Sequence, residues 1–264
     1  MKRTKFLGLA AAAFLSCQQG NNTELNGKID ELTKKMDTLT EMVKKGGGAK
    51  GPQRPQRPRP NPKDVYAVNI DGAPFKGAKD AKVTVVKAFE FAWPFCQKVG
   101  PTLDTLLKDY KGDIKVVYKH FVVHPGSATE PALAACAADK QGKFEGMYDD
   151  IWTKAFAKRD FKPENMEKIA KELGLDVAKF KADKNGECKK IIAKDQAELR
   201  AVGTSGTPAF YINGRFLSGA RPVEQFKVLV DEELKKANAA IGKDGLTAAN
   251  YYQKNILAKG KKKL

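Results

Sequence analysis

Thiol chemistry is the first chemistry this sequence suggests, and its cysteines are few: Cys17, Cys96, Cys136 and Cys188. Cys96 lies in FEFAWPFCQKVGP (89–101), where an apolar run passes into a helical pattern of leucines. A thiol on the first residues of such a helix is stabilised as the thiolate by unpaired backbone N–H groups and by the helix dipole. Cys96 stands three residues beyond that point. Dithiol exchange also needs a second sulfur to resolve the mixed disulfide, and this segment has only one.

The two histidines do not extend this site. His124 follows a strand pattern, so we expect it to pack or form a hydrogen bond there rather than act as a base or metal ligand. His120 lies inside the strand pattern and has no Cys, His or carboxylate at metal-ligand spacing. The sequence also has no phosphate-binding glycine loop, nucleophile elbow or zinc motif. We therefore expect neither a metal nor a cofactor.

The residues around Cys96 have the pattern of a βαβ unit. Segments 65–70 and 82–89 are typical of strands, 94–110 of a helix, and 114–123 of a third strand. Strands joined through a helix in this way run parallel.

Helical patterns then dominate the chain as far as residue 200. Glycines interrupt them at Gly142, Gly174 and Gly186, which predicts several short helices. PAFYINGRFL (208–217) predicts a β-hairpin that turns at Asn213-Gly214, and an amphipathic helix begins near Pro222. The order of elements over 64–240 predicts an α/β thioredoxin-like fold with a helical insertion.

The N-terminal residues predict export. Three basic residues precede an apolar stretch (6–15) too short to span a bilayer, and a serine and Cys17 follow. Residues 1–17 are thus expected to be a signal peptide with a lipobox. Lipidated Cys17 would then anchor the protein to a membrane of the bacterial cell envelope, on the periplasmic side. Cleavage without lipidation and an uncleaved chain are the alternatives.

A short coiled coil and a linker follow. The apolar residues of 22–45 are spaced alternately by four and three, which predicts a homo-oligomer, with a parallel dimer favoured and a trimer left open. A monomeric, frayed helix is the alternative, because three heptads are marginal alone. Residues 46–63 are rich in Gly, Pro and Arg, which predicts an extended linker before the domain.

The formal net charge of +17 comes almost entirely from the two ends of the chain. Setting aside three cations before residue 6, seven in 44–63 and five in 254–264 leaves +2 for the rest. A nucleic-acid-binding face on the domain is therefore not expected. The linker and the basic C-terminal tail (241–264) are expected to be solvated, with contact to anionic envelope surfaces as the alternative.

Five segments resemble the DsbA-like branch of the thioredoxin superfamily, the periplasmic thiol-disulfide oxidoreductases. They are FEFAWPFC with Pro101 shortly after it, KHFVVHP, ALAACAADKQGKF, GLDVAKF and VGTSGTPAFYING, and the similarity spans roughly 68–237. The resemblance implies that Thr207-Pro208 is a cis-proline loop, which faces the active-site cysteines and pairs its backbone with an extended substrate peptide. An ordinary trans proline is the alternative.

The resemblance also shows what this chain lacks. The family has Cys-Pro-Tyr-Cys or a close variant where this chain has Trp93-Pro94-Phe95-Cys96, so Trp93 replaces the attacking cysteine. Only the resolving position remains, and it is buried in the family, which implies a raised pKa and a poor nucleophile at Cys96. Cys136 and Cys188 match positions where some members carry an additional pair, so we expect a structural disulfide, with two separate buried thiols as the alternative.

Three functions follow from these features. The first is a member of the disulfide oxidoreductase family that has lost the CxxC dithiol and binds extended peptides or unfolded protein clients through Trp93, Pro94, Phe95, Thr207 and Pro208. The second is residual oxidoreductase or isomerase activity in which Cys96 is the single catalytic thiol. The third is a scaffold whose oligomerised domains serve the architecture of the envelope.

Overall fold

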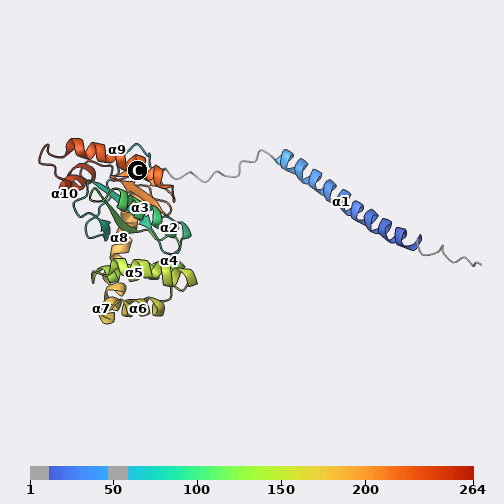
Figure 1. Cartoon of the computed structure of the whole chain (residues 1–264), viewed down its shortest axis with the longest axis horizontal. Coiled ribbons are helices and arrows are strands. Elements are labelled where there is room, and N and C mark those ends of the chain that lie inside the picture. Colours follow the sequence, from blue (N-terminus) through green and yellow to red (C-terminus); the bar gives the residue numbers. More distant parts are fainter. Residues whose placement is uncertain (1–11, 47–58) are drawn as a thin grey trace, which may run out of the picture. The chain divides into compact units, whose positions relative to one another are not determined.

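The structure, a computed structural model, describes residues 12–46 and 59–264 of the chain. The chain divides into two units, Met1–Arg57 and Pro58–Leu264 (Figure 1). The predicted signal peptide lies largely outside the described residues, as does most of the predicted linker. In the described part of the chain, no helix is long and apolar enough to cross a membrane.

The described residues of the first unit form one helix, α1 (Ala12–Gly46). Pairs of oppositely charged side chains four residues apart support it, Lys28 with Glu24 and Lys35 with Glu31, each at 2.7 Å. The heptad side chains are between 50% and 67% exposed in this single chain, namely Leu25, Ile29, Leu32, Met36 and Leu39. The helix agrees with the sequence, and its pairing with further copies stays a prediction.

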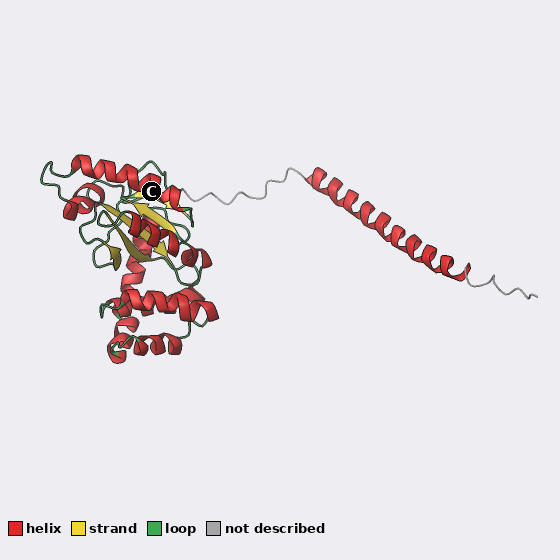
Figure 2. Cartoon of the chain, in the orientation of Figure 1, coloured by secondary structure: helices red, strands yellow, loops and turns green. Residues whose placement is uncertain are grey.

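The second unit is built on a five-stranded sheet in the order β1-β3-β2-β4-β5 (Figure 2). Its strands are β1 (Phe75–Gly77), β2 (Val83–Phe89), β3 (Ile114–His120), β4 (Ala209–Ile212) and β5 (Arg215–Ser218). β2 and β3 are parallel, as the βαβ pattern predicts, and the other neighbours are antiparallel. This is the predicted thioredoxin-like fold.

The hairpin between β4 and β5 turns at Asn213 and Gly214, whose φ values are +42° and +82°. Two consecutive positive φ angles are the requirement of the tight turn that matches strand twist. A Cβ on Gly214 would also lie 2.6 Å from the carbonyl oxygen of Tyr66. The predicted turn is confirmed.

The helices are more divided than the sequence pattern indicates. The segment predicted as one helix over 94–110 forms α2 (Pro94–Lys98) and α3 (Gly100–Asp109). Pro101 explains the break, because a proline has no N–H to continue the helical hydrogen bonds. The last long helix is α9 (Val223–Ala240), which begins after Pro222 as predicted.

The helical insertion lies between β3 and β4. Its elements are α4 (Pro125–Asp139), α5 (Phe144–Asp150), a π-helical turn (Ile151–Ala155), a 3₁₀ turn (Phe156–Lys158), α6 (Pro163–Glu172), α7 (Val177–Asn185) and α8 (Glu187–Ala201). In Figure 1, α5, α6 and α7 gather at one end of the unit, and α8 runs from them back towards the sheet.

Alternate residues of β2 feed two separate apolar cores. Val83, Val85 and Phe89 belong to a core shared with α2, α3, α9 and the insertion. Val86 and Ala88 point to the other face, where they meet Tyr211 and the C-terminal residues. β2 is therefore buried on both faces, and the connection that follows it is held firmly.

Two predictions need correction. Residues 65–70 form only isolated bridges, Val65 with Arg215 and Tyr66 with Lys261. Their backbone bonds go to two separate places, because the Tyr66 N–H donates to the Gly214 carbonyl oxygen and the Ala67 N–H to that of Lys261. Residues 241–264 are not a solvated tail, since they form α10 (Ala248–Tyr251) and a π-helical turn (Tyr252–Leu257). They bury Tyr251, Tyr252 and Ile256 against the sheet. The apolar residues between the lysines drive this packing, so the domain extends well beyond residue 240.

Candidate functional site

Trp93 and Cys96 lie where β2 leads into α2. Trp93 precedes the helix in an extended conformation, and Pro94 is the first helical residue. The Cys96 N–H donates to the carbonyl oxygen of Trp93 over 3.0 Å, and the Cys96 side chain has no exposed surface. Phe95, in contrast, is 47% exposed. The position at the helix start thus carries an indole, while the thiol lies inside.

The environment of Cys96 opposes ionisation. Burial raises the pKa of the thiol, and three weaker influences lower it: a hydrogen bond from the Glu90 backbone, the charge of Lys87 and the Thr207 hydroxyl. The charge of Glu90 adds to the increase. Because the thiolate is the nucleophile, this sulfur is disfavoured for attack in the native state. The expected direction of the pKa shift is confirmed.

The loop that contains Thr207 and Pro208 lies next to Cys96. The peptide bond between Thr207 and Pro208 is cis, as the resemblance implies. β4 begins directly afterwards at Ala209, which pairs with Ala88 of β2. Since Thr207 reaches the Cys96 sulfur, the loop and the WPFC segment form one site.

Glu90 and His124 form a pair that the sequence prediction of the site does not include. The Glu90 side chain is fully buried and accepts hydrogen bonds from the backbone N–H groups of Val123 at 2.6 Å and His124 at 2.9 Å. The His124 ring also contacts it through Nδ1. One carboxylate therefore fixes the connection between β3 and α4. The His124 ring forms a hydrogen bond, as expected.

The His124 ring also contacts Trp93. The two rings are stacked, with centroids 5.5 Å apart and planes inclined by 20°. The centroid of the Phe95 ring lies 5.5 Å from that of Trp93, with the planes inclined by 41°. Trp93 is partly buried, so the three rings form an aromatic surface at the mouth of the site.

Two cationic side chains form hydrogen bonds to the backbone near this aromatic surface. The Lys87 ammonium is fully buried and donates to the Cys96 carbonyl oxygen at 3.2 Å and to the Tyr148 hydroxyl at 2.8 Å. Arg159 donates to the Ala92 carbonyl oxygen at 3.0 Å. Both hold the backbone on either side of Trp93. The sequence offers a sign of Lys87 and Glu90, because charged residues in or next to an apolar strand run are unusual.

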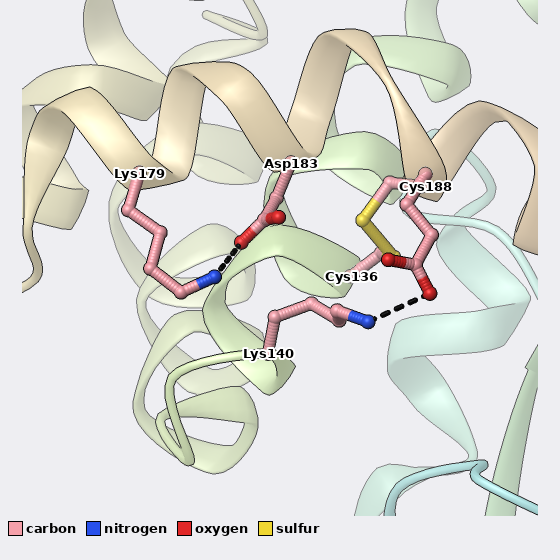
Figure 3. The surroundings of a disulfide bond; sticks show 6 residues. Cys136, Lys140, Lys179, Asp183 and Cys188 are labelled. Carbon is pink, nitrogen blue, oxygen red and sulfur yellow. Dashed lines mark hydrogen bonds and ion pairs between the residues drawn. A yellow bond between two sulfur atoms is a disulfide. The ribbon is translucent and has the colours of Figure 1, made fainter.

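Two of the other cysteines form a disulfide within the second unit. Cys136 of α4 and Cys188 of α8 form a disulfide with Cα atoms 5.8 Å apart (Figure 3). An ion pair between Lys140 and Glu187 joins the same two helices at 2.8 Å. The side chain of Cys17 lies outside the described residues. Within the described ranges, no group of three or more His, Cys, Asp or Glu side chains has the arrangement of a metal site.

Comparison with known families matches residues 70–232 to a family model described as Thioredoxin. Among curated proteins, the Na(+)/H(+) antiporter NhaA 3 of Salinispora tropica is 34% identical over 173 residues, which are 63% of this chain and 25% of that protein. The chain thus spans about a quarter of the curated relatives it matches, and the antiporter name belongs to those whole proteins.

Solved structures show the same fold. A thioredoxin-like oxidoreductase from Silicibacter pomeroyi has a TM-score of 0.54 and 26% identity, covering 62% of this chain and 94% of the other. The catalytic domain of Proteus mirabilis ScsC has 0.54 and 24%, covering 63% and 92%. A periplasmic thioredoxin-like protein from Salmonella enterica serovar Typhimurium has 0.52 and 22%, covering 62% and 91%.

Proposed function

The chain belongs to the thioredoxin family, as a DsbA-like member, and we propose that it binds extended peptide segments of client proteins without exchanging their disulfides. The observation that carries this proposal is the arrangement at the helix start: the partly buried indole of Trp93 precedes the helix, Phe95 beside it is 47% exposed, and the one thiol lies inside with a raised pKa. Such a site offers apolar surface but no ready nucleophile.

The proline loop supplies the polar part of the binding site. In the described part of the chain, the Thr207 N–H donates no hydrogen bond to another protein group, and the Thr207 C=O accepts none. An extended peptide can pair with these groups as an added strand, while its side chains contact Trp93 and Phe95. Backbone pairing makes such binding tolerant of sequence, which suits unfolded clients.

Peptide binding can be measured by fluorescence anisotropy with a labelled decapeptide that contains leucines and glutamates. We expect Phe95→Ala and Trp93→Ala to weaken binding by about tenfold, since aromatic anchors dominate such contacts. Phe75→Ala is the matched control, because Phe75 is 44% exposed but lies on β1, away from the site. Equal affinities for all these variants would refute the proposal.

A second candidate function is monothiol chemistry at Cys96. It is favoured by Lys87 and Thr207, which both stabilise the thiolate against the effect of burial. In this function the Cys96 thiolate would attack the disulfide of an oxidised client, form a mixed disulfide with one client sulfur and release the other as a thiolate. Trapping that adduct with an oxidised peptide and losing it in Cys96→Ser would support it, and absence of any adduct would exclude it.

The proposal extends to where the protein acts. The basic and apolar N-terminal residues support export to the periplasmic side of the envelope and lipidation at Cys17. The exposed heptad stripe of α1 supports self-association through 22–45, which would present several client sites together. Metabolic labelling with a palmitate analogue, lost in Cys17→Ser, tests the anchor.

A further inference from the structure

An apolar groove of about 490 Å³ lies between the start of α4 and the face of α8. Its apolar wall consists of Val122, Val123, Pro125, Leu133, Ile192 and Ala193. Val123 is 41% exposed, so its apolar side chain is accessible at the groove. This groove is separate from the Cys96 site, and the proposed function does not use it.

The groove is continuous with the aromatic surface. Val123 and Pro125 flank His124, and the His124 ring is the one stacked on Trp93. The groove and the aromatic surface therefore adjoin each other at residues 123–125.

Hydrogen bonds within the protein fix the conformation of residues 122–125, which form one wall of the groove. Glu90 occupies the backbone N–H groups of Val123 and His124. Gln196 of α8 bonds both backbone groups of Val122, at 3.3 Å to its N–H and 3.2 Å to its C=O. Since these polar groups are satisfied internally, the side chain of Val123 has a fixed outward position. A preorganised apolar wall of this kind lowers the ordering cost of binding.

The rim of the groove carries positively charged side chains. Lys189 and Arg200 line it at two points of α8. Arg200 lies over the Phe121 ring at 5.8 Å, and within the described residues no carboxylate pairs with either side chain. Many other lysines of this domain do pair with carboxylates, such as Lys140 with Glu187. Two unpaired cations beside an apolar wall complement a segment that carries acidic side chains.

We infer that this groove is a second client subsite, which binds an apolar side chain and a neighbouring Asp or Glu of the same extended segment that contacts Trp93. The inference rests on the proposed function and adds a substrate class to it. Clients with acidic residues beside apolar ones are bound in preference to clients with amides at those positions.

The test compares two labelled decapeptides, one with leucines and glutamates and one with glutamines in place of the glutamates. The full chain is expected to bind the acidic peptide at least about fivefold more tightly. Lys189→Glu with Arg200→Glu removes that preference and weakens the acidic peptide by about tenfold, while the glutamine peptide keeps its affinity. Lys190→Glu is the matched control, since Lys190 is exposed on α8 but does not line the groove.

The outcomes separate the inference from the proposed function. If both peptides bind in a Trp93-dependent way and the double charge reversal changes neither affinity, the subsite is refuted and the client site stands. If neither peptide binds, both proposals fail. If the double reversal alters sedimentation of the protein instead of peptide affinity, the groove takes a second copy of this chain, which also contradicts the inference.

Discussion

Replacing Glu90 by alanine tests how the client surface is held in place. The buried carboxylate accepts two backbone hydrogen bonds from 123–124 and contacts the His124 ring. Removing it leaves two N–H donors without a partner, each costing about 1–3 kcal/mol when desolvated. The histidine side chain is 49% exposed and can turn to water, so it adds little. We expect Glu90→Ala to lower the free energy of unfolding by about 2–6 kcal/mol.

Glu90→Gln keeps the shape and one acceptor oxygen but loses the charge. Its expected loss is smaller, about 1–2 kcal/mol, because charge-assisted bonds become neutral ones. Glu187→Ala is the control on a surface carboxylate: Glu187 is 56% exposed and pairs with Lys140, so its removal costs at most about 1 kcal/mol.

Urea unfolding followed by circular dichroism gives these free energies. Tryptophan emission adds a local readout, since the chain has only two tryptophans and Trp152→Phe leaves Trp93 alone. In that background, Glu90→Ala is expected to shift Trp93 emission to the red as the His124 stack loosens. A Glu90→Ala protein within 1 kcal/mol of the parent, with unchanged Trp93 emission, would refute the role assigned to Glu90.

Three other predictions concern groups whose surroundings are equally well defined. Cys136→Ala with Cys188→Ala opens a loop closed over 52 residues and is expected to cost about 4 kcal/mol in urea unfolding; a loss under 1 kcal/mol would contradict it. Burial lowers the pKa of His120 from 6.5 to about 4. About 3 kcal/mol of stability that is present above pH 6.5 is therefore lost as the pH falls towards 4. When the free energy of unfolding is measured against pH, His120→Gln is expected to flatten that slope. Iodoacetamide is expected to alkylate Cys96 at least about tenfold more slowly in the native protein than in urea, and equal rates would show that the thiol is accessible.

The fold was accessible from sequence because its signals are local. The apolar run of β2, the Asn213-Gly214 turn and the glycine breaks of the insertion each predict an element without long-range information. The break at Pro101 had a signal too, but the leucine periodicity across it favoured one helix. The sequence prediction that the C-terminal residues are a solvated tail was wrong because lysines dominate their composition. Only the folded structure shows that Tyr252 packs on a face of the sheet.

The sequence predicts which residues make up the candidate site but not which residues hold them in place. Trp93, Cys96 and the Thr207-Pro208 loop follow from the motif and its resemblance. Glu90 lies 34 residues from His124, and no spacing rule connects a strand end with a loop that far away. The stacking of Trp93 on His124 likewise depends on the fold bringing two connections together. Such pairs become visible only when the strands are in register.

Turnover in a disulfide exchange assay tests the central claim most directly. Insulin reduction is measured with the parent chain, Cys96→Ser and Trp93→Cys, the last of which restores a Cys-Pro-Phe-Cys segment. We expect the parent to match Cys96→Ser, and Trp93→Cys to gain activity, because the helix start and the cis-proline loop are intact. Turnover by the parent that Cys96→Ser abolishes would contradict a client site that binds without exchanging disulfides.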